Sequence, residues 1–344
     1  MRELIDSLKK LSPDLLEIMQ QRYILMENVE LLQPIGRRAL AANTNLTERH
    51  VRGEIDTLAG QGLIDASPKG MQLTKEGKLV IEQLASFMHD LMGLNVLESR
   101  LKERLQLNSV IIVPGNSDEH EWVKEEMGKA CVTFLEEHML SEKTIAVTGG
   151  TTMTAVAEMM RPSENTAECL FVPARGGLGE QEENQANKIA ARMARQAKGS
   201  YRQLYVPDPL SESSYQTMIH EPAVMDVLQL IQHASVVLHG IGDALTMAER
   251  RKTSPEVIGK LKQEKAVSEA FGYYFDAAGE VVHKVRTIGL HLEDLTASRQ
   301  SVVAVAGGAS KAQAIQSFFK QGGSDLLITD EAAAEAILRE DSSL

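Results

Sequence analysis

The sequence lacks any apolar run long enough to cross a lipid bilayer, because its hydrophobic stretches have the length of a strand and are interrupted. Residues 1–6 mix acidic and basic side chains without an apolar segment, so they do not resemble a signal peptide. The only two cysteines, Cys131 and Cys169, both lie in apolar periodic segments. These absences argue against a membrane protein, a disulfide-rich secreted protein and a cysteine-ligated metal site. We expect a cytoplasmic protein with two buried free thiols and no metal.

Size and charge indicate a globular protein of about two domains. The chain has 344 residues, of which 43% are hydrophobic and 24% charged. Its net charge of −12 argues against loose nucleic-acid binding by the whole chain. The acidic excess, however, lies almost entirely after residue 106, and the preceding part is nearly neutral. A local basic surface is therefore compatible with the N-terminal part.

The N-terminal third has the element order of a winged helix-turn-helix. Two helical patterns cover residues 4–32, and we expect them to pack on the next domain. A short helix over 34–43 is followed by a turn and by Thr47, a good N-cap for a second helix. A hairpin with a turn at 68–70 then completes the order helix, turn, helix, hairpin.

In such a motif the second helix presents its outer face to the DNA major groove. Arginine suits guanine edges, and cations elsewhere in the domain suit backbone phosphates. A winged helix used only for protein contacts is the alternative, and a lone His50 is more often an ordinary surface residue. The predicted DNA contacts are Arg49, His50 and Arg52 on the helix, with Arg37, Arg38 and Lys69 at phosphates.

Residues 78–106 carry an apolar stripe close to a heptad repeat, weakened by Gly93. It predicts one long helix that links two domains and pairs subunits into a homodimer or homotetramer; packing on the next domain is the alternative. The expected division is a DNA-binding domain at 1–77, a linker helix at 78–106 and an effector domain at 107–344.

From Asn108 onward, strands alternate with helices, which is typical of an α/β domain with a Rossmann-like parallel sheet. The segment 270–283 differs and predicts a hairpin or β-flap. The candidate strands are Val110–Val113, Ile145–Thr148, Cys169–Val172, Tyr201–Val206, Ser235–Leu238, Val302–Ala306 and Leu326–Thr329.

One strand end has the features of a phosphate pocket. The apolar run 145–147 stops at Gly149 and Gly150, and Thr151 and Thr152 then begin a helical pattern. Glycines let the backbone approach an anion, the helix start favours negative charge, and the hydroxyls add donors. The stretch lacks the lysine of a P-loop and is not the dinucleotide fingerprint. A tight turn without a ligand is the alternative.

Other strand ends bring cations to the same edge, where ligands of open parallel sheets bind. Arg175 follows the third strand, and either Arg250 or Arg251 follows the fifth. A second glycine turn at 307–308 precedes Lys311. An acidic protein that gathers cations at one edge is most simply explained by an anionic ligand, and two turns suggest two anionic groups. Each cation alone could be a solvated surface charge.

These features together resemble the SorC family of bacterial sugar-responsive regulators. The resemblance implies a transcriptional repressor of a glycolytic operon that binds operator DNA and has no cofactor. It also implies an effector domain similar to sugar-phosphate isomerases and deaminases, with fructose 1,6-bisphosphate as the effector. Besides the winged helix and linker, the matching segments are Val147–Thr152, Phe171–Gly179, His239–Gly242, Glu269–Phe275 and Ala304–Gly308.

The resemblance assigns roles at matching positions. It implies that residues Gly149 to Thr152 cradle one phosphate and that Arg250 and Lys311 hold charge at a phosphate. Arg175, Gln185 and Glu269 would contact the sugar or the second phosphate. Gln185 and Glu269 are selected by the resemblance alone.

The alternative is an enzyme, an isomerase or deaminase on the same fold, which needs a general acid and base. Glucosamine-phosphate deaminases carry a histidine shortly after a comparable Gly-Ile-Gly turn, where this sequence has 243–248 without histidine. His239 precedes the turn instead. We therefore expect no catalytic residue. Asp243 and Glu269 could form an acid–base pair, which keeps the enzyme as the alternative.

Overall fold

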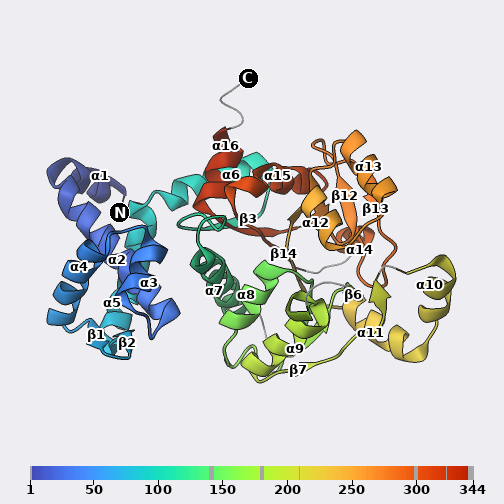
Figure 1. Cartoon of the computed structure of the whole chain (residues 1–344), viewed down its shortest axis with the longest axis horizontal. Helices are drawn as coiled ribbons and strands as arrows, with labels where there is room; N and C mark the ends of the chain where they lie inside the picture. Colours follow the sequence, from blue (N-terminus) through green and yellow to red (C-terminus); the bar gives the residue numbers. More distant parts are fainter. Residues whose placement is uncertain are drawn as a thin grey trace. The chain divides into compact units, whose positions relative to one another are not determined.

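The computed structural model describes residues 2–138, 143–178, 182–208, 210–297, 301–322 and 324–339 (Figure 1). The chain divides into two compact units, Met1–Leu97 and Glu98–Leu344, and the boundary lies inside the segment expected to link the domains. No helix of the described part combines the length and apolar character needed to cross a membrane.

The first unit has the predicted winged helix-turn-helix. Thr47 caps α4 as expected, since its hydroxyl accepts a hydrogen bond from the His50 N–H at 3.2 Å. Val51 and Ile55 of that helix are fully buried in the core of the unit. The elements in order are α1 (Arg2–Leu11), α2 (Pro13–Leu32), α3 (Arg37–Thr44), α4 (Glu48–Gly60), β1 (Ile64–Ser67) and β2 (Gly70–Leu73).

The expected single helix over 78–106 is wrong in one respect: it is two helices, α5 (Lys75–Leu91) and α6 (Leu94–Leu105). Gly93 adopts φ +77°, which glycine reaches without steric cost, and its N–H bonds the Asp90 carbonyl. The apolar stripe is therefore divided, and its first part, including Met88, belongs to the core of the first unit.

The second unit contains a seven-stranded sheet in which every neighbouring pair is parallel, as predicted. All seven candidate strands are present in it. Their order is β3 (Ser109–Val113), β15 (Leu326–Asp330), β14 (Ser301–Val305), β9 (Val236–His239), β4 (Thr144–Val147), β5 (Leu170–Pro173) and β7 (Ser200–Tyr201).

The chain runs outward from β4 to β5 and β7, then returns through β9 to β14 and β15. Because crossovers between parallel strands are right-handed, α7, α8 and α9 cover one face of the sheet, where α8 contacts both α7 and α9, and α11 and α15 cover the other. The direction reverses between β4 and β9, and a crevice opens at such a point. The helices are α7 (Glu121–His138), α8 (Thr151–Met159), α9 (Ala186–Ala197), α11 (Pro222–Gln232), α15 (Ala312–Lys320) and α16 (Glu331–Arg339).

The predicted strand at 201–206 is much shorter than expected. The Asn187 side chain bonds both the N–H and the carbonyl of Leu204, each at 2.9 Å, in place of a neighbouring strand. Because this contact comes from another element, the local pattern could not reveal it.

The predicted flap at 270–283 is part of a four-stranded antiparallel sheet, β10-β11-β12-β13. Cys131 and Cys169 are free and buried, which confirms that prediction, and burial raises the pKa of the Cys131 thiol to about 12. The remaining elements are β6 (Gly177–Leu178), η1 (Glu182–Asn184), β8 (Pro207–Asp208), α10 (Glu212–Met218), β10 (Gly242–Asp243), α12 (Ala244–Arg250), α13 (Pro255–Gln263), β11 (Ser268–Ala270), β12 (Tyr273–Phe275), β13 (Val281–Lys284), α14 (Leu292–Ala297) and η2 (Ala309–Lys311).

Candidate functional site

A cavity of about 360 Å³ opens at the carboxyl ends of β4, β9 and β14. The Thr148 hydroxyl joins the first two strand ends by accepting a hydrogen bond from the Gly240 N–H at 3.3 Å. Nine of the ten residues predicted to bind the effector line this cavity: Gly149, Gly150, Thr151, Thr152, Arg175, Arg250, Arg251, Glu269 and Lys311.

In the turn between β4 and α8 the Gly150 N–H donates to the Asn184 carbonyl at 2.9 Å, and the donors that remain are those at the start of α8. Gly149 packs so closely on the loop at 184 that a Cβ there would lie 2.6 Å from the Asn184 carbonyl oxygen. Gly150 has φ +121° and gives α8 no side-chain cap. The first N–H groups of a helix have no partner within the helix, so those of Thr151 and Thr152 remain for a ligand. An oxyanion is the chemical group that suits them.

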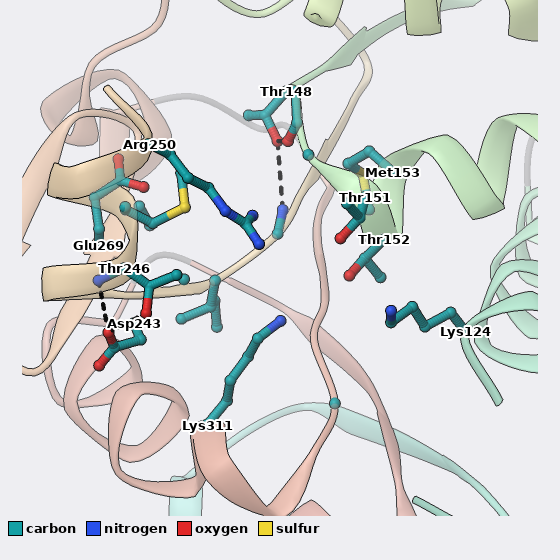
Figure 2. Close-up of a pocket in the computed structure, with 18 of the residues that line it drawn as sticks. Lys124, Thr148, Thr151, Thr152, Met153, Asp243, Thr246, Arg250, Glu269 and Lys311 are labelled. Carbon is teal, nitrogen blue, oxygen red and sulfur yellow. Dashed lines mark hydrogen bonds between the residues drawn. The ribbon is translucent and has the colours of Figure 1, made fainter. Parts of the chain in front are cut away.

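Three cations converge on the same space from three different elements. Figure 2 shows Arg250 from α12, Lys311 from η2 and Lys124 from α7 pointing toward a common centre. The hydroxyls of Thr151 and Thr152 point there too. Neither Arg250 nor Lys311 forms an ion pair with a carboxylate of the described residues, while Lys124 lies 2.7 Å from Glu121. The arrangement is that of a site for a multiply charged anion.

The pKa of the Lys311 ammonium group is lowered by this environment. Burial lowers its pKa first, and the positive charges of Lys124 and Arg250 lower it further, while Asp118 and Asp330 raise it. Like charges held together in a partly buried site repel one another until an anion enters. The free energy gained on neutralising them favours an anionic ligand over a neutral one.

Arg175 and Arg251 have a different role from Arg250. Their side chains are 5% and 4% exposed and flank the equally buried Glu269. The Arg251 Nη2 lies 2.6 Å from the Glu269 Oε1, and the Arg175 Nη1 lies 3.8 Å from it. The same oxygen accepts the Gly272 N–H at 2.8 Å. These charges form a buried network in the cavity wall, which anchors the flap of β11 and β12.

The second glycine turn differs from the prediction that each turn offers its amides to an anionic group. The Gly308 N–H donates to the Asp330 Oδ2 at 2.7 Å, and Asp330 is fully buried. The Ser310 N–H and hydroxyl both donate to the Asp118 carboxylate at 2.8 Å. Carboxylates of the chain itself therefore already hold these donors, and sequence spacing gave no sign of either contact.

Gln185 is the predicted effector residue that does not line the cavity. It stands at the N-cap position of α9, where its Oε1 faces Gly177. Gly179, the end of the loop expected to follow Arg175, lies outside the described residues. In turn, sequence reasoning missed Lys124 and Asp118, because they lie on α7 and the preceding turn, which carry no local phosphate signal.

The cations predicted to meet DNA lie on the first unit. Arg49, Arg52 and Lys69 are exposed, and Arg52 and Arg38 both lie beside Glu48, at 3.7 and 3.4 Å. Such exposed ion pairs are worth about 1 kcal/mol or less, so phosphates can replace them.

Two more of the six residues form exposed hydrogen bonds with side chains of their own domain. Arg37 is half-buried and bonds Asp56 at 3.0 Å, and the His50 ring bonds the Gln21 side chain of α2 at 3.0 Å.

Comparison with known proteins decides the family. Residues 18–88 match the family described as CggR N-terminal DNA binding domain, and residues 89–339 match a family of sugar-binding domains. The chain is 52% identical over 341 residues to the central glycolytic genes regulator of Priestia megaterium, covering 99% of both. Identity to the protein of that name from Bacillus subtilis is 50% over 341 residues, covering 99% of this chain and 100% of that one. The chain belongs to the SorC family of transcriptional regulators.

Solved structures agree with this assignment. A SorC family transcriptional regulator from Enterococcus faecalis is 46% identical, with a TM-score of 0.67 over 70% of this chain and 99% of that chain. The full-length sorbitol operon regulator SorC from Klebsiella pneumoniae has a TM-score of 0.68 over 94% of this chain and 99% of that one. At 16% identity, the second likeness concerns the fold alone.

Membership of the SorC family makes the chain a regulator of transcription with a DNA-binding and a sugar-binding domain, not an enzyme. The side chains considered for catalysis are engaged in keeping with this. The Asp243 carboxylate caps α12 through the Thr246 N–H at 2.8 Å, and Glu269 is paired as described. His239 is fully buried, bonds Ser324 at 2.9 Å, and has a pKa lowered by burial to about 4.

Proposed function

We propose that this SorC-family protein is a repressor of glycolytic genes and that a phosphorylated sugar, fructose 1,6-bisphosphate, weakens its hold on operator DNA. The observation that carries the ligand class is the convergence of Lys124, Arg250 and Lys311 on the hydroxyls of Thr151 and Thr152. A neutral sugar would leave Arg250 and Lys311 without an ion-pair partner among the described residues, whereas a phosphate neutralises them. The names of the two relatives at 50% and 52% identity support a role at glycolytic genes.

The mechanism is linkage between two sites. DNA favours one arrangement of subunits and the sugar phosphate another, so each ligand weakens the binding of the other by the same factor. A homodimer or homotetramer provides the repeated DNA contacts, and its operator should contain half-sites spaced by turns of the double helix. Arg175, Glu269 and Gln185 are proposed to meet the sugar or its second phosphate.

A calorimetric titration of the full chain against phosphorylated hexoses and trioses tests the ligand class. We expect binding of fructose 1,6-bisphosphate and weaker binding of unphosphorylated fructose by at least about a hundredfold, since charged hydrogen bonds contribute roughly 1.5–3 kcal/mol each. Equal affinity for the two sugars, or no binding of any phosphorylated sugar, would refute the proposal. Turnover of a sugar phosphate in the same mixture would contradict its non-enzymatic part.

Arg52→Ala tests the DNA-binding surface separately. Its side chain is exposed on α4, so folding should be unaffected. Loss of a base or phosphate contact costs about 1–3 kcal/mol, or roughly 5- to 150-fold in operator affinity. Stabilisation by the sugar phosphate should survive in a thermal melt. An operator titration that matches wild type would show that α4 is not the recognition helix.

A further inference from the structure

The carboxylate of Asp118 occupies part of the cavity that suits a ligand oxyanion. Its Oδ2 accepts the Ser310 N–H, and its Oδ1 accepts the Ser310 hydroxyl, each at 2.8 Å. Two neighbouring oxygens of a phosphoryl group can accept the same pair of donors. Asp118 also lies near the Lys311 ammonium group, since its charge raises the pKa of that lysine.

Asp118 differs from the other carboxylates that line the cavity. Glu269 is 5% exposed and its charge is matched by Arg251 and Arg175. Asp243 caps α12 through Thr246. Asp118, in contrast, is exposed on a turn.

The turn that carries Asp118 does not depend on the contact with Ser310. The N–H of the preceding residue, Ser117, donates to the buried Asp330 at 2.7 Å. The Asp118 N–H donates to the Asn116 side chain at 3.1 Å. Rotation of the Asp118 side chain would therefore release both donors of Ser310 while the turn keeps its own hydrogen bonds.

Resting on the proposed function, we propose that Asp118 sets the preference of the cavity between sugars with one phosphate and sugars with two. A monophosphate held at Thr151 and Thr152 leaves Asp118 bonded to Ser310. A bisphosphate brings its second phosphate to the N–H and hydroxyl of Ser310 and must displace the carboxylate. The repulsion and the lost hydrogen bonds then reduce the affinity for the bisphosphate alone.

Asp118→Asn tests this, because asparagine has the same shape and can still accept the Ser310 N–H, but carries no charge. Calorimetry on the full chain would compare fructose 1,6-bisphosphate, fructose 6-phosphate and inorganic phosphate. We expect affinity for the bisphosphate to rise about tenfold and affinity for the two monophosphoryl ligands to change less than about threefold. Asp118→Ala should change the affinities in the same direction.

Glu119→Gln is the matched control. It removes the same charge from the next residue, which is exposed and does not line the cavity. Its ratio of bisphosphate to monophosphate affinity should equal that of wild type. Equal gains for both ligands in Asp118→Asn, or no gain for the bisphosphate in either Asp118 variant, would overturn the inference. If the wild-type protein binds no sugar phosphate, the proposed function itself is refuted.

Discussion

The two glycine turns of the effector unit have similar sequences and opposite states. At the turn 149–150 the Gly150 N–H bonds the Asn184 carbonyl at 2.9 Å, but no carboxylate of the described residues bonds the first N–H groups of α8, and Thr151 and Thr152 line the cavity. The turn at 307–308 is closed, because Asp330 and Asp118 accept the hydrogen bonds of Gly308 and Ser310. A glycine turn before a helix therefore marks where an anion can bind, but neighbouring carboxylates decide whether a ligand or the protein supplies it.

The largest effect should come from removing the buried carboxylate of the closed turn. Asp330 accepts three backbone N–H groups, from Ser117, Gly308 and Ala333, at 2.7, 2.7 and 2.9 Å. Asp330→Ala leaves them without this partner in the core, which should lower the free energy of unfolding by about 3–5 kcal/mol. Urea denaturation measures it. Asp118→Ala is the control at the same turn, with an expected loss below about 1 kcal/mol because that carboxylate is exposed. Similar losses in the two variants would contradict the assignment of Asp330 as structural.

Next in size is the loss of a cation that faces the open turn. Arg250→Ala removes a guanidinium group that points into the cavity, so affinity for fructose 1,6-bisphosphate should fall roughly 10- to 100-fold. Calorimetry measures the change, and operator binding without sugar should persist. Lys262→Ala, which removes an equal charge from an exposed position of α13, should have little effect. An equally large loss of affinity in Lys262→Ala would indicate that the net charge of the protein, and not contact between Arg250 and the sugar phosphate, determines the affinity.

A smaller effect is expected from a hydroxyl of the open turn. Thr152→Val preserves the shape of a side chain that is 7% exposed but removes its donor. A hydrogen bond to a charged group is worth about 1.5–3 kcal/mol, and the hydroxyl itself carries no charge, so sugar phosphate affinity should fall about tenfold, at the low end of that range. Thr217→Val on α10, where the hydroxyl bonds the Ser213 carbonyl, serves as the control. Unchanged affinity in Thr152→Val would mean that the ligand does not reach the start of α8.

The smallest expected effect is one of pH. The pKa of Lys311 is lowered by burial and by Lys124 and Arg250, so its charge is lost at a lower pH than that of an ordinary lysine. A phosphate monoester is already dianionic above about pH 7, since its second pKa is about 6. Affinity should therefore fall, by about three- to tenfold, as the pH rises through the lowered pKa of the lysine and the ammonium group deprotonates. Lys311→Arg should remove this dependence, because arginine stays charged. A wild-type affinity independent of pH would show that Lys311 does not hold the phosphate.

Much of the fold could be predicted from the sequence because its signals are local. Most candidate strands are short apolar runs, several of them rich in β-branched residues, and the helices between them indicate a parallel sheet. The two wrong predictions about strands and helices have causes outside the local pattern, namely a contact from another element and the conformation of a single residue. The strand at 201–206 is cut short by the Asn187 side chain, and the expected long helix is divided by the left-handed conformation of Gly93.

The site was predictable only in part. The open turn at 149–152 could be predicted because its residues are consecutive in the sequence. Lys124 and Asp118 could not, because they reach the cavity from segments distant in the chain. The sequence also left open which of Arg250 and Arg251 meets the ligand. Successive helical residues point about 100° apart, so Arg250 faces the cavity centre while Arg251 reaches Glu269.

The central claim, that a sugar phosphate in the cavity loosens the hold on DNA, is tested most directly by operator titrations of the full chain with and without fructose 1,6-bisphosphate. We predict a weaker operator complex in the presence of the sugar. The affinity for the sugar should also fall by the same factor when operator is bound, because linkage between two binding sites is reciprocal. Operator titrations that coincide with and without saturating sugar would contradict the account.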